Sequence, residues 1–489
     1  MTNKKIVLLY IILFVVSLVI RLYMINQDKF LNPWDEQYHA MVAKNMMTHP
    51  LEPMLYSDSV LSYDYKNWNR NHIWVHKQPL FLWQSALSMK IFGANEFAMR
   101  LASAILSALL VLVVFRIGII ISGILTGFIA ALLMMTNQFH LMQISGAMGM
   151  DHNDVSFMVY VAFSIWVWLE YEISKKNFWL VLLGVFVGCA VLCKWLTGLL
   201  VYAAWGIDAL FIRKYFFIEK NWLKIFLSLI VCLLVFLPWQ FYILYKFPIE
   251  ARNEFAFNEK HLTEVLEGHA GNFFFHFIKL PAIYFKLALL IPLGMITLYF
   301  KTRQKWMWYS LMFMMWFIYL FFSFAKTKFI PLTVIVMPIG FLFIASAIET
   351  LISFIVKIKM KWAAYIVSSC FVLIICLLNF KYVFFMEVHR PGGFHFGWGN
   401  NFYEKKTANS RVYRKLSSEI PSDYIIINCP KDDEISCMFY SGKTSYNWLS
   451  DSDIKKLKTK GLRIASFLSN ASSEVLSDNE ILKIPYEVK

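Results

Sequence analysis

Residues 6–20, IVLLYIILFVVSLVI, form an uncharged run that directly follows Lys4 and Lys5. With the three residues that follow, the run is long enough for a helix that crosses the hydrocarbon core of a bilayer. The chain is 58% hydrophobic and only 16% charged, which is typical of membrane proteins and too apolar for a soluble protein of 489 residues. By the usual length rule we predict a mainly α-helical, polytopic membrane protein with about eleven transmembrane helices. The predicted spans are residues 6–25, 97–119, 122–141, 154–170, 178–193, 195–212, 222–245, 281–300, 306–325, 329–351 and 362–385.

The net charge of +15 does not indicate a nucleic-acid partner, because most of the excess lies in short loops between the apolar runs. Basic loops orient helices and stay on the cytoplasmic side. We expect the spans to cross a cytoplasmic (inner) membrane in alternating directions. All of these clusters then lie on its cytoplasmic side, as does the N-terminus. The loops 26–96 and 246–280 and the tail 386–489 are then extracytoplasmic. The basic clusters are Lys175 and Lys176; Arg213, Lys214 and Lys220; Lys301, Arg303 and Lys305; and Lys357, Lys359 and Lys361.

Composition divides the chain into a membrane domain, residues 1–385, and a small α/β domain, residues 386–489. In the tail, residues 424–428 and 463–468 are predicted strands, and residues 452–460 form a charged helix that ends at Gly461. This tail is expected to cover or position a site at the membrane, and its Cys429 and Cys437 can form a disulfide in an oxidising compartment. In the loop 26–96, residues 38–47 and 80–89 are predicted amphipathic helices at the membrane interface.

Acidic residues in the outside loops are the first candidates for catalysis. Asp35 and Glu36 follow Pro33-Trp34 at a helix start just beyond the first span. A carboxylate there can serve as a general base on an acceptor hydroxyl, or hold a metal or a sugar. The alternative is a purely structural role, because the helix dipole favours acidic residues at a helix N-terminus. Asp151, in the outside turn Asp151-His152-Asn153-Asp154, is a second candidate; its alternative is a solvated loop carboxylate.

Cations on the same side are candidates for binding a phosphate. Lys77, in His76-Lys77-Gln78-Pro79, directly precedes a predicted interfacial helix, although a lysine that extends toward the headgroups would have the same pattern. Lys326 and Lys328 lie in an outside turn against the positive-inside trend. Glu36, Tyr38 and Arg100 complete the predicted substrate-binding residues, and the polar aromatic stretch 63–70 is suited to stacking on sugars or to an interfacial belt.

Histidines in the outside loops are candidates for a divalent metal. The loop 246–280 contains Glu259, His261, Glu264, Glu267, His269 and His276, and His76 lies on the same side. Their spacing fits no strict metal signature. The alternative is that these are ordinary hydrogen-bonded histidines of a polar loop that bind no metal. His76 and His269 are the metal ligands that we predict.

The order of these features resembles the C-type, lipid-donor glycosyltransferases, among them bacterial aminoarabinose transferases and protein O-mannosyltransferases. The resemblance rests on the acidic pair, the Lys-x-Pro segment, the outside Asp, the Lys194–Gly198 turn, the histidine loop and the Lys-x-Lys turn, over about residues 1–350. It implies inverting transfer of a hexosyl or pentosyl group from a polyprenyl phosphate to an envelope lipid, glycan or protein.

The resemblance also implies roles for single residues. The family's first-loop aspartate corresponds to Asp35, its second loop acid to Asp151 and its phosphate-contacting lysine to Lys77. Where the family often has Glu-Lys-Pro-Pro, this chain has His76-Lys77-Gln78-Pro79. His269 corresponds to the family's loop histidine.

Two other classes of protein share parts of this pattern. A polytopic transporter or lipid flippase also has many spans, but such proteins commonly contain internal repeats and polar residues near the middle of the membrane. We find no convincing repeat, and the acids lie toward one face. A non-catalytic envelope scaffold built around the tail is the third alternative.

Overall fold

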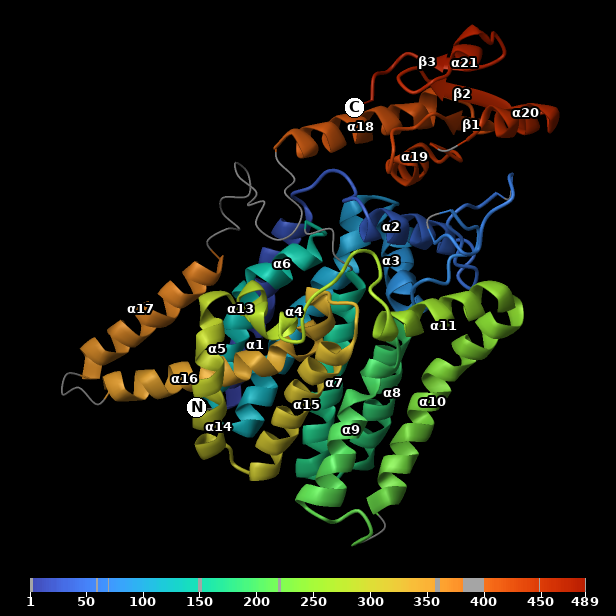
Figure 1. Cartoon of the computed structure of the whole chain (residues 1–489). Helices are drawn as coiled ribbons and strands as arrows, with labels where there is room; N and C mark the ends of the chain where they lie inside the picture. Colours follow the sequence, from blue (N-terminus) through green and yellow to red (C-terminus); the bar gives the residue numbers. More distant parts are fainter. Residues whose placement is uncertain are drawn as a thin grey trace.

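Long helices form most of the chain, and a small α/β unit lies at one end of them, beside α2 and α3 (Figure 1). The computed structural model describes residues 3–58, 60–68, 70–147, 152–218, 221–356, 361–380, 400–447 and 449–488. The helices of the first half are α1 (Asn3–Ile25), α2 (Asp35–Met46), α3 (Pro79–Phe92), α4 (Glu96–Ile121), α5 (Ile124–Thr136), α6 (Gln138–Ile144), α7 (His152–Ser174), α8 (Asn177–Lys194), η1 (Trp195–Leu199), α9 (Leu200–Ile207), η2 (Asp208–Ile212) and α10 (Asn221–Lys246).

The second half continues the bundle and then forms the α/β unit. Its helices up to α17 are α11 (Pro248–Thr263), α12 (Phe275–Ile278), α13 (Leu280–Tyr284), η4 (Phe285–Leu290), α14 (Ile291–Lys301), α15 (Lys305–Phe324), η5 (Ile330–Val336), α16 (Met337–Val356) and α17 (Lys361–Phe380). The C-terminal unit consists of α18 (Asn400–Glu419), β1 (Tyr424–Ile427), α19 (Glu434–Ser441), α20 (Asp451–Thr459), β2 (Arg463–Phe467), α21 (Ser473–Ser477) and β3 (Leu482–Ile484).

Within the described residues, 8 helical segments are long and apolar enough to cross a membrane, or 9 when the bent pair α5–α6 counts as one span. The 51° bend of that pair lies at Asn137, whose backbone is extended and whose side chain caps α6 by accepting from the His140 amide. The outer faces are apolar as well, with Leu234 and Phe241 exposed on α10. These features make the chain a multi-pass membrane protein.

One of those segments, Asn177–Ile212, reverses direction at η1. Trp195 has a positive φ of 62°, and a Cβ on Gly198 would lie only 2.8 Å from the Val191 backbone nitrogen. Lys194 pairs with Asp154 at the start of α7, whereas Trp205 packs on Tyr171 near the end of α7, with ring centroids 5.7 Å apart. α8 and α9 are therefore antiparallel, as the sequence predicted for residues 178–193 and 195–212. The total of eleven spans remains a prediction.

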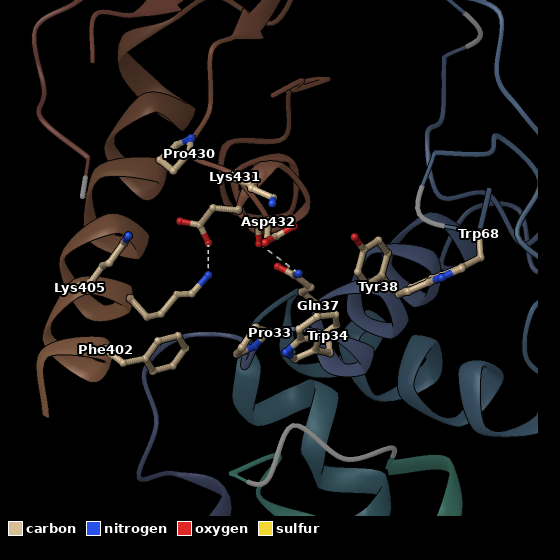
Figure 2. A pocket seen from close by; sticks show the side chains of 12 residues that line it. Pro33, Trp34, Gln37, Tyr38, Trp68, Phe402, Lys405, Pro430, Lys431 and Asp432 are labelled. Carbon is tan, nitrogen blue, oxygen red and sulfur yellow. Dashed lines mark hydrogen bonds and ion pairs between the residues drawn. The ribbon is translucent and has the colours of Figure 1, made fainter. Parts of the chain in front are cut away.

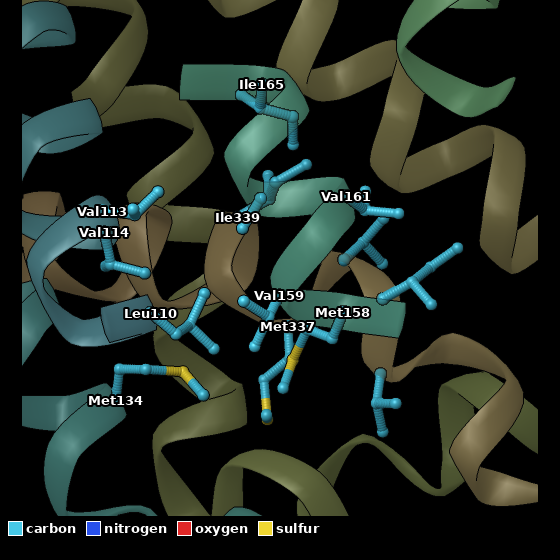
Figure 3. Close-up of a cluster of buried hydrophobic side chains, with 14 of the residues drawn as sticks. Leu110, Val113, Val114, Met134, Met158, Val159, Val161, Ile165, Met337 and Ile339 are labelled. Carbon is cyan, nitrogen blue, oxygen red and sulfur yellow. The ribbon is translucent and has the colours of Figure 1, made fainter. Parts of the chain in front are cut away.

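The core of the bundle is formed by apolar faces of α4, α5, α7 and α16. Helix α8 approaches α10 closely because Gly184 and Gly188 are four residues apart on one face. A Cβ on Gly184 would lie 2.5 Å from the Ser228 carbonyl oxygen. Figure 3 shows part of the core, labelled at Leu110, Val113, Val114, Met134, Met158, Val159, Val161, Ile165, Met337 and Ile339.

The C-terminal unit contains a parallel three-stranded sheet in the order β1-β2-β3, with Tyr424 opposite Arg463. The predicted strands and the charged helix are present. Ser450 begins α20 with a capping box, and Gly461 follows the helix with a positive φ of 74°. Residues 381–399, which contain the predicted boundary between domains, lie outside the described residues, so that boundary remains a prediction.

The C-terminal unit shares a hydrophobic core with the first loop. Ile425 and Ile427 on one face of β1 belong to the same buried cluster as Leu55, Trp74 and Phe81. Ile426 faces the other way, into a cluster with residues of α18 that also contains Cys429 and Cys437 as free thiols. Loop and tail therefore stabilise one another, although they are more than 300 residues apart in sequence.

Helices α2 and α3 occupy the two segments predicted as amphipathic and interfacial. The C-terminal unit and α3 pack on α2, and most residues of α2 are buried, including Tyr38, Ala40, Val42, Ala43 and Met46. The predicted helix is present as α2, with a segment distant in sequence packed on it, and its position at the membrane interface stays a prediction. An interfacial position for α3 remains a prediction.

Candidate functional site

Asp35 is the first residue of α2 and lies beside Lys77. The Lys77 Nζ atom is 3.7 Å from Asp35 Oδ1, and the side chains are 19% and 24% exposed. The preceding residue, Trp34, has a positive φ of 66°, a backbone conformation that costs an L-residue free energy and that concentrates at functional sites. A carboxylate and an ammonium, both accessible to a ligand, thus meet at the start of one helix.

The segment that carries Lys77 is anchored on both sides. His76 Nδ1 lies 2.8 Å from Glu254 Oε1 of α11, and its ring stacks on Trp68 with centroids 5.4 Å apart. On the other side, Gln240 of α10 donates to Gln78 Oε1 at 2.7 Å, and Pro79 opens α3. These contacts hold the Lys77 backbone in place, so that the segment itself need not become ordered when Lys77 binds a charged group.

Glu36, next to Asp35, has a different environment. Its carboxylate is completely buried and accepts hydrogen bonds from Arg100 Nε at 2.6 Å and Arg100 Nη2 at 3.0 Å. It also accepts from the Asn32 amide at 2.6 Å, and His152 Nε2 lies 3.1 Å away. Burial alone raises the pKa of Glu36, but the charge of Arg100 and the hydrogen bonds outweigh it and hold the pKa well below its usual range.

Arg100 connects this carboxylate to the backbone around it. Its remaining N–H groups donate to the carbonyls of Ile25, Asp28 and Phe30, so all five N–H groups have acceptors. Neither Arg100 nor Glu36 is accessible to solvent. The prediction that Glu36 and Arg100 bind substrate is corrected: they fix the segment between α1 and α2 that presents Asp35.

The lysines of the outside turn after α15 also differ from one another. Lys328 is buried, and its ammonium donates to the carbonyls of Phe322, Ser323 and Ala325 at 3.0, 2.6 and 2.5 Å. It caps the C-terminus of α15, so its predicted role in phosphate binding is corrected to a structural one. Burial lowers the pKa of Lys328. Lys326 has an exposed side chain, while its backbone amide donates to the Leu262 carbonyl at 3.1 Å.

The two predicted metal ligands have other partners. His76 is bonded to Glu254, and His269 packs on Phe329 with ring centroids 4.8 Å apart. Across the described part of the chain, no three His, Cys, Asp or Glu side chains are grouped so that they could hold a metal ion. These residues therefore do not fit a metal site, and we derive no step through one.

The remaining predicted site residues are Tyr38 and Asp151. Tyr38 lines a pocket between α2 and the C-terminal unit, and its ring lies 4.6 Å from that of Trp68. Asp151 lies outside the described residues. Its neighbours His152 and Asp154 are described: His152 contacts Glu36, and Asp154 pairs with Lys194 of the predicted outside turn.

Several residues of this region were not singled out from the sequence. They are Trp34, Gln37, Phe402, Lys405, Lys431 and Asp432, all of which line the pocket beside Tyr38. The aromatic stretch 63–70 was a usable signal, because it contains Trp68. The residues from the tail gave no signal, since only the shared core of loop and tail brings them to α2.

Fold and site together define a class of protein. It is a multi-pass helical protein in which a carboxylate and an ammonium lie together at one end of the bundle, beneath a small α/β unit. Residues 76–242 match the family model described as dolichyl-phosphate-mannose-protein mannosyltransferase. A protein of unassigned function from Aquifex aeolicus (strain VF5) is 26% identical over 312 residues, which are 62% of this chain and 56% of that protein. The chain thus spans little more than half the length of that relative.

Two solved structures share the fold. ArnT from Cupriavidus metallidurans, bound to undecaprenyl phosphate, superposes with a TM-score of 0.67 at 13% identity, over 94% of this chain and 88% of that chain. The second is the archaeal oligosaccharyltransferase AglB from Archaeoglobus fulgidus, in complex with an inhibitory peptide and a dolichol-phosphate. It superposes with a TM-score of 0.57 at 13% identity, over 89% of this chain and 64% of that chain. The predicted resemblance to the C-type, lipid-phosphate-sugar glycosyltransferases is confirmed.

Proposed function

We propose that this protein is an integral membrane glycosyltransferase that moves a sugar from a polyprenyl-phosphate donor to an acceptor of the cell envelope. Transfer takes place on the outer side of the cytoplasmic membrane, where the C-terminal unit lies, and the N-terminus is cytoplasmic. Support comes from the shared fold with proteins solved with undecaprenyl phosphate and dolichol-phosphate. The proposal depends most on one observation, the 3.7 Å pair of Lys77 and Asp35 at an accessible helix start.

Lys77 is proposed to bind the phosphate of the donor. The leaving group departs as a phosphate anion, so it needs a nearby positive charge more than a proton donor. An ammonium is a compact charge that binds phosphate well, and the anchored neighbours of Lys77 hold it in position. The phosphate competes with Asp35 for this ammonium, which leaves the Asp35 carboxylate available to the acceptor.

Asp35 is proposed as the general base. The acceptor hydroxyl oxygen forms a new bond to the anomeric carbon while the bond from that carbon to the phosphate oxygen breaks on the opposite face. The hydroxyl proton goes to the Asp35 carboxylate, and the bonding electron pair leaves with the polyprenyl phosphate. Attack opposite the leaving group inverts the anomeric centre. Asp151 is proposed as the second acid and Lys326 as an additional cation on the same side.

Glu36 and Arg100 act through Asp35 and are positioning residues. Asp35 can reach the acceptor proton only if the start of α2 is fixed within a fraction of an ångström. The buried pair fixes it, because Arg100 binds both the Glu36 side chain and three carbonyls of the preceding segment.

The test is transfer by the purified protein from radiolabelled polyprenyl-phosphate sugars to envelope acceptors, with the product anomer determined by NMR. Asp35→Asn keeps the shape but removes the base, and should lower turnover by about 10²-fold or more. Asp64→Asn, an exposed carboxylate of the same loop, is the matched control and should be near wild type. Asp35→Asn with wild-type turnover would show that the assigned base is wrong; a retained anomeric configuration would remove the single-displacement mechanism.

A further inference from the structure

A pocket lies where α2 meets the C-terminal unit (Figure 2). Its volume is about 270 Å³, just below the roughly 300–1,000 Å³ of pockets that hold drug-sized ligands, which favours a small ligand. One wall comes from the first loop and the start of α2, and the other from α18 and the segment before α19. The lining residues are Pro33, Trp34, Gln37, Tyr38, Trp68, Phe402, Lys405, Lys406, Pro430, Lys431, Asp432 and Asp433.

The pocket adjoins the start of α2, where Asp35 lies, although Asp35 and Lys77 are not among its lining residues. Trp34 directly precedes Asp35 in the chain. Tyr38 is three residues beyond Asp35 on α2, and residues at that spacing are neighbours on a helix face. A molecule held between Trp34 and Tyr38 therefore lies next to the helix start that carries Asp35.

Aromatic rings form much of the surface. Trp34 is 52% exposed and is held in a left-handed backbone conformation, so the fold maintains an exposed indole at a cost in free energy. Tyr38 and Trp68 lie with ring centroids 4.6 Å apart, and Phe402 of α18 lines the other side of the pocket. Rings with an apolar face and a polar edge suit a sugar, which has an apolar C–H face and a rim of hydroxyls.

The charges in the pocket leave an excess of cations. Lys406 and Asp433 form a buried pair at 2.6 Å, and Asn409 and Tyr413 also bind that carboxylate. Lys405 and Lys431 are exposed, and among the described residues neither has a carboxylate within ion-pair distance. With Asp432 as the remaining acid, the pocket carries a net positive charge, which favours an anionic group.

The two walls are tied together across the pocket. The Gln37 amide donates to the Asp432 carbonyl at 3.3 Å, and Ser436 donates to Gln37 Oε1 at 2.9 Å. The shared core beneath them keeps α2 and α19 in contact. The pocket is therefore formed before a ligand arrives, which reduces the entropy lost on binding.

We propose that this pocket binds the acceptor, and that the acceptor presents there a sugar carrying an anionic group, a phosphate or a carboxylate. The inference rests on the proposed transfer at Asp35 and adds to it the class of acceptor. The aromatic residues bind the ring of the sugar, and Lys405 and Lys431 bind its anionic group.

The test measures binding of glucose 6-phosphate, glucuronate, methyl glucoside and inorganic phosphate to the full-length protein in nanodiscs, by tryptophan fluorescence. The anionic sugars should bind best. The double variant Lys405→Ala with Lys431→Ala should lower the affinity for the anionic sugars by about tenfold or more. It should leave the affinity for methyl glucoside unchanged. Trp34→Ala should weaken every sugar, whereas Trp34→Phe, which retains a ring, should weaken them less.

Lys455→Ala is the matched control, because it removes one positive charge from the exposed face of α20, outside the pocket. It should leave all affinities unchanged. Inorganic phosphate binding as tightly as the sugars would overturn the proposal in favour of a simple anion site. Tight binding of an unglycosylated peptide acceptor, sensitive to the same substitutions, would overturn it in favour of a protein acceptor.

Transfer assays separate this inference from the proposed function. The double lysine variant should raise the KM for a phosphorylated acceptor and leave the KM for the polyprenyl-phosphate donor unchanged. A phosphorylated glycolipid and a soluble phosphorylated oligosaccharide, compared as acceptors, distinguish a lipid-linked source from a free one. Unchanged acceptor KM in the double lysine and Trp34→Ala variants would overturn the pocket alone, whereas wild-type protein without any transfer would overturn the proposed function.

Discussion

The carboxylate of Glu36 accepts two hydrogen bonds from the guanidinium of Arg100, at 2.6 and 3.0 Å, and neither side chain is accessible to solvent. Asp35, the adjacent residue, is partly exposed and pairs with Lys77. Two neighbouring acids thus have separate tasks, because the helix turns one toward the bundle and the other toward the opening. The buried pair provides structure, and the exposed pair is available for chemistry.

Glu36→Gln should lower the stability of the folded protein, since it leaves the charge of Arg100 buried without a carboxylate. Loss of one partner of a buried pair costs about 3–5 kcal/mol. Arg100→Met should cost a similar amount, and the double variant less than the sum. Thermal unfolding of the purified proteins measures this, with Asp64→Asn as control. Single variants as stable as wild type would contradict the structural role.

The sequence predicted those parts of the structure that depend on local patterns. Apolar runs marked the long helices, short buried runs marked β1 and β2, and Gly461 marked the end of α20. Asp35 and Lys77 were also identified, and the structure places them together.

Contacts between distant segments could not be predicted in this way. Lys328 has the pattern of a phosphate-binding lysine, yet it caps α15, because the direction of its side chain depends on the path of the turn. Glu36 was grouped with Asp35, and only the position of Arg100, 64 residues away, shows that it is buried. The pocket depends on residues more than 360 positions apart in the printed sequence, such as Trp34 and Phe402, so no local pattern indicates it.

Gly146→Ala should disturb the site through Glu36. Gly146 has a φ of +71°, and a Cβ there would lie 2.7 Å from Glu36 Oε2. Backbone strain of this kind costs about 1–3 kcal/mol, and displacement of the carboxylate adds to it. We expect lower thermal stability together with lower transfer activity.

Gly206→Ala is the control for this substitution. Gly206 lies in α9, and no atom would lie within 4 Å of an added Cβ. Alanine favours a helix by about 0.5–1 kcal/mol over glycine, so this variant should be as stable as wild type or more so. If both glycine variants behaved alike, close packing of Gly146 on Glu36 would not be the cause.

Lys77→Ala should weaken donor binding and turnover together, because the phosphate is negative both in the substrate and in the leaving group. Lys77→Arg should be tolerated only in part, since a planar fork replaces a compact ammonium. Donor affinity and transfer rate are measured for both. The exposed Lys66 of the same loop provides the control, Lys66→Ala. An unaltered Lys77→Ala variant would remove this lysine from the site.

Lys326 and Lys328 should differ in the property that their loss affects. Lys328→Met leaves three carbonyls at the end of α15 without their donor, and should lower the unfolding temperature. Lys326→Met removes an exposed cation, and should weaken binding of the donor with little change in stability. Unfolding and donor titration are run on both proteins. A destabilised Lys326→Met variant with normal donor affinity would reverse these assignments.

Glu434 should make stability depend on pH near neutrality. Burial, reinforced by Asp432 and Asp433, raises its pKa to about 7, while Asn447 donates to its carboxylate at 2.7 Å. Because the folded state binds this proton more tightly than the unfolded chain, whose glutamates titrate near pH ~4.3, stability should fall as the pH rises from about 4.5 to 7. The loss should level off above that range, at no more than about 4 kcal/mol.

Unfolding temperatures of the full-length protein between pH 5 and 8 test this sign. Glu434→Gln keeps the hydrogen bond with Asn447 and cannot ionise, so its profile should be flatter than that of the wild type and higher near pH 8. Glu474→Gln, on the exposed surface of α21, is the control and should follow the wild type. A wild-type protein that becomes more stable from pH 5 to 7, with Glu434→Gln following it, would show that Glu434 is ionised in the folded state.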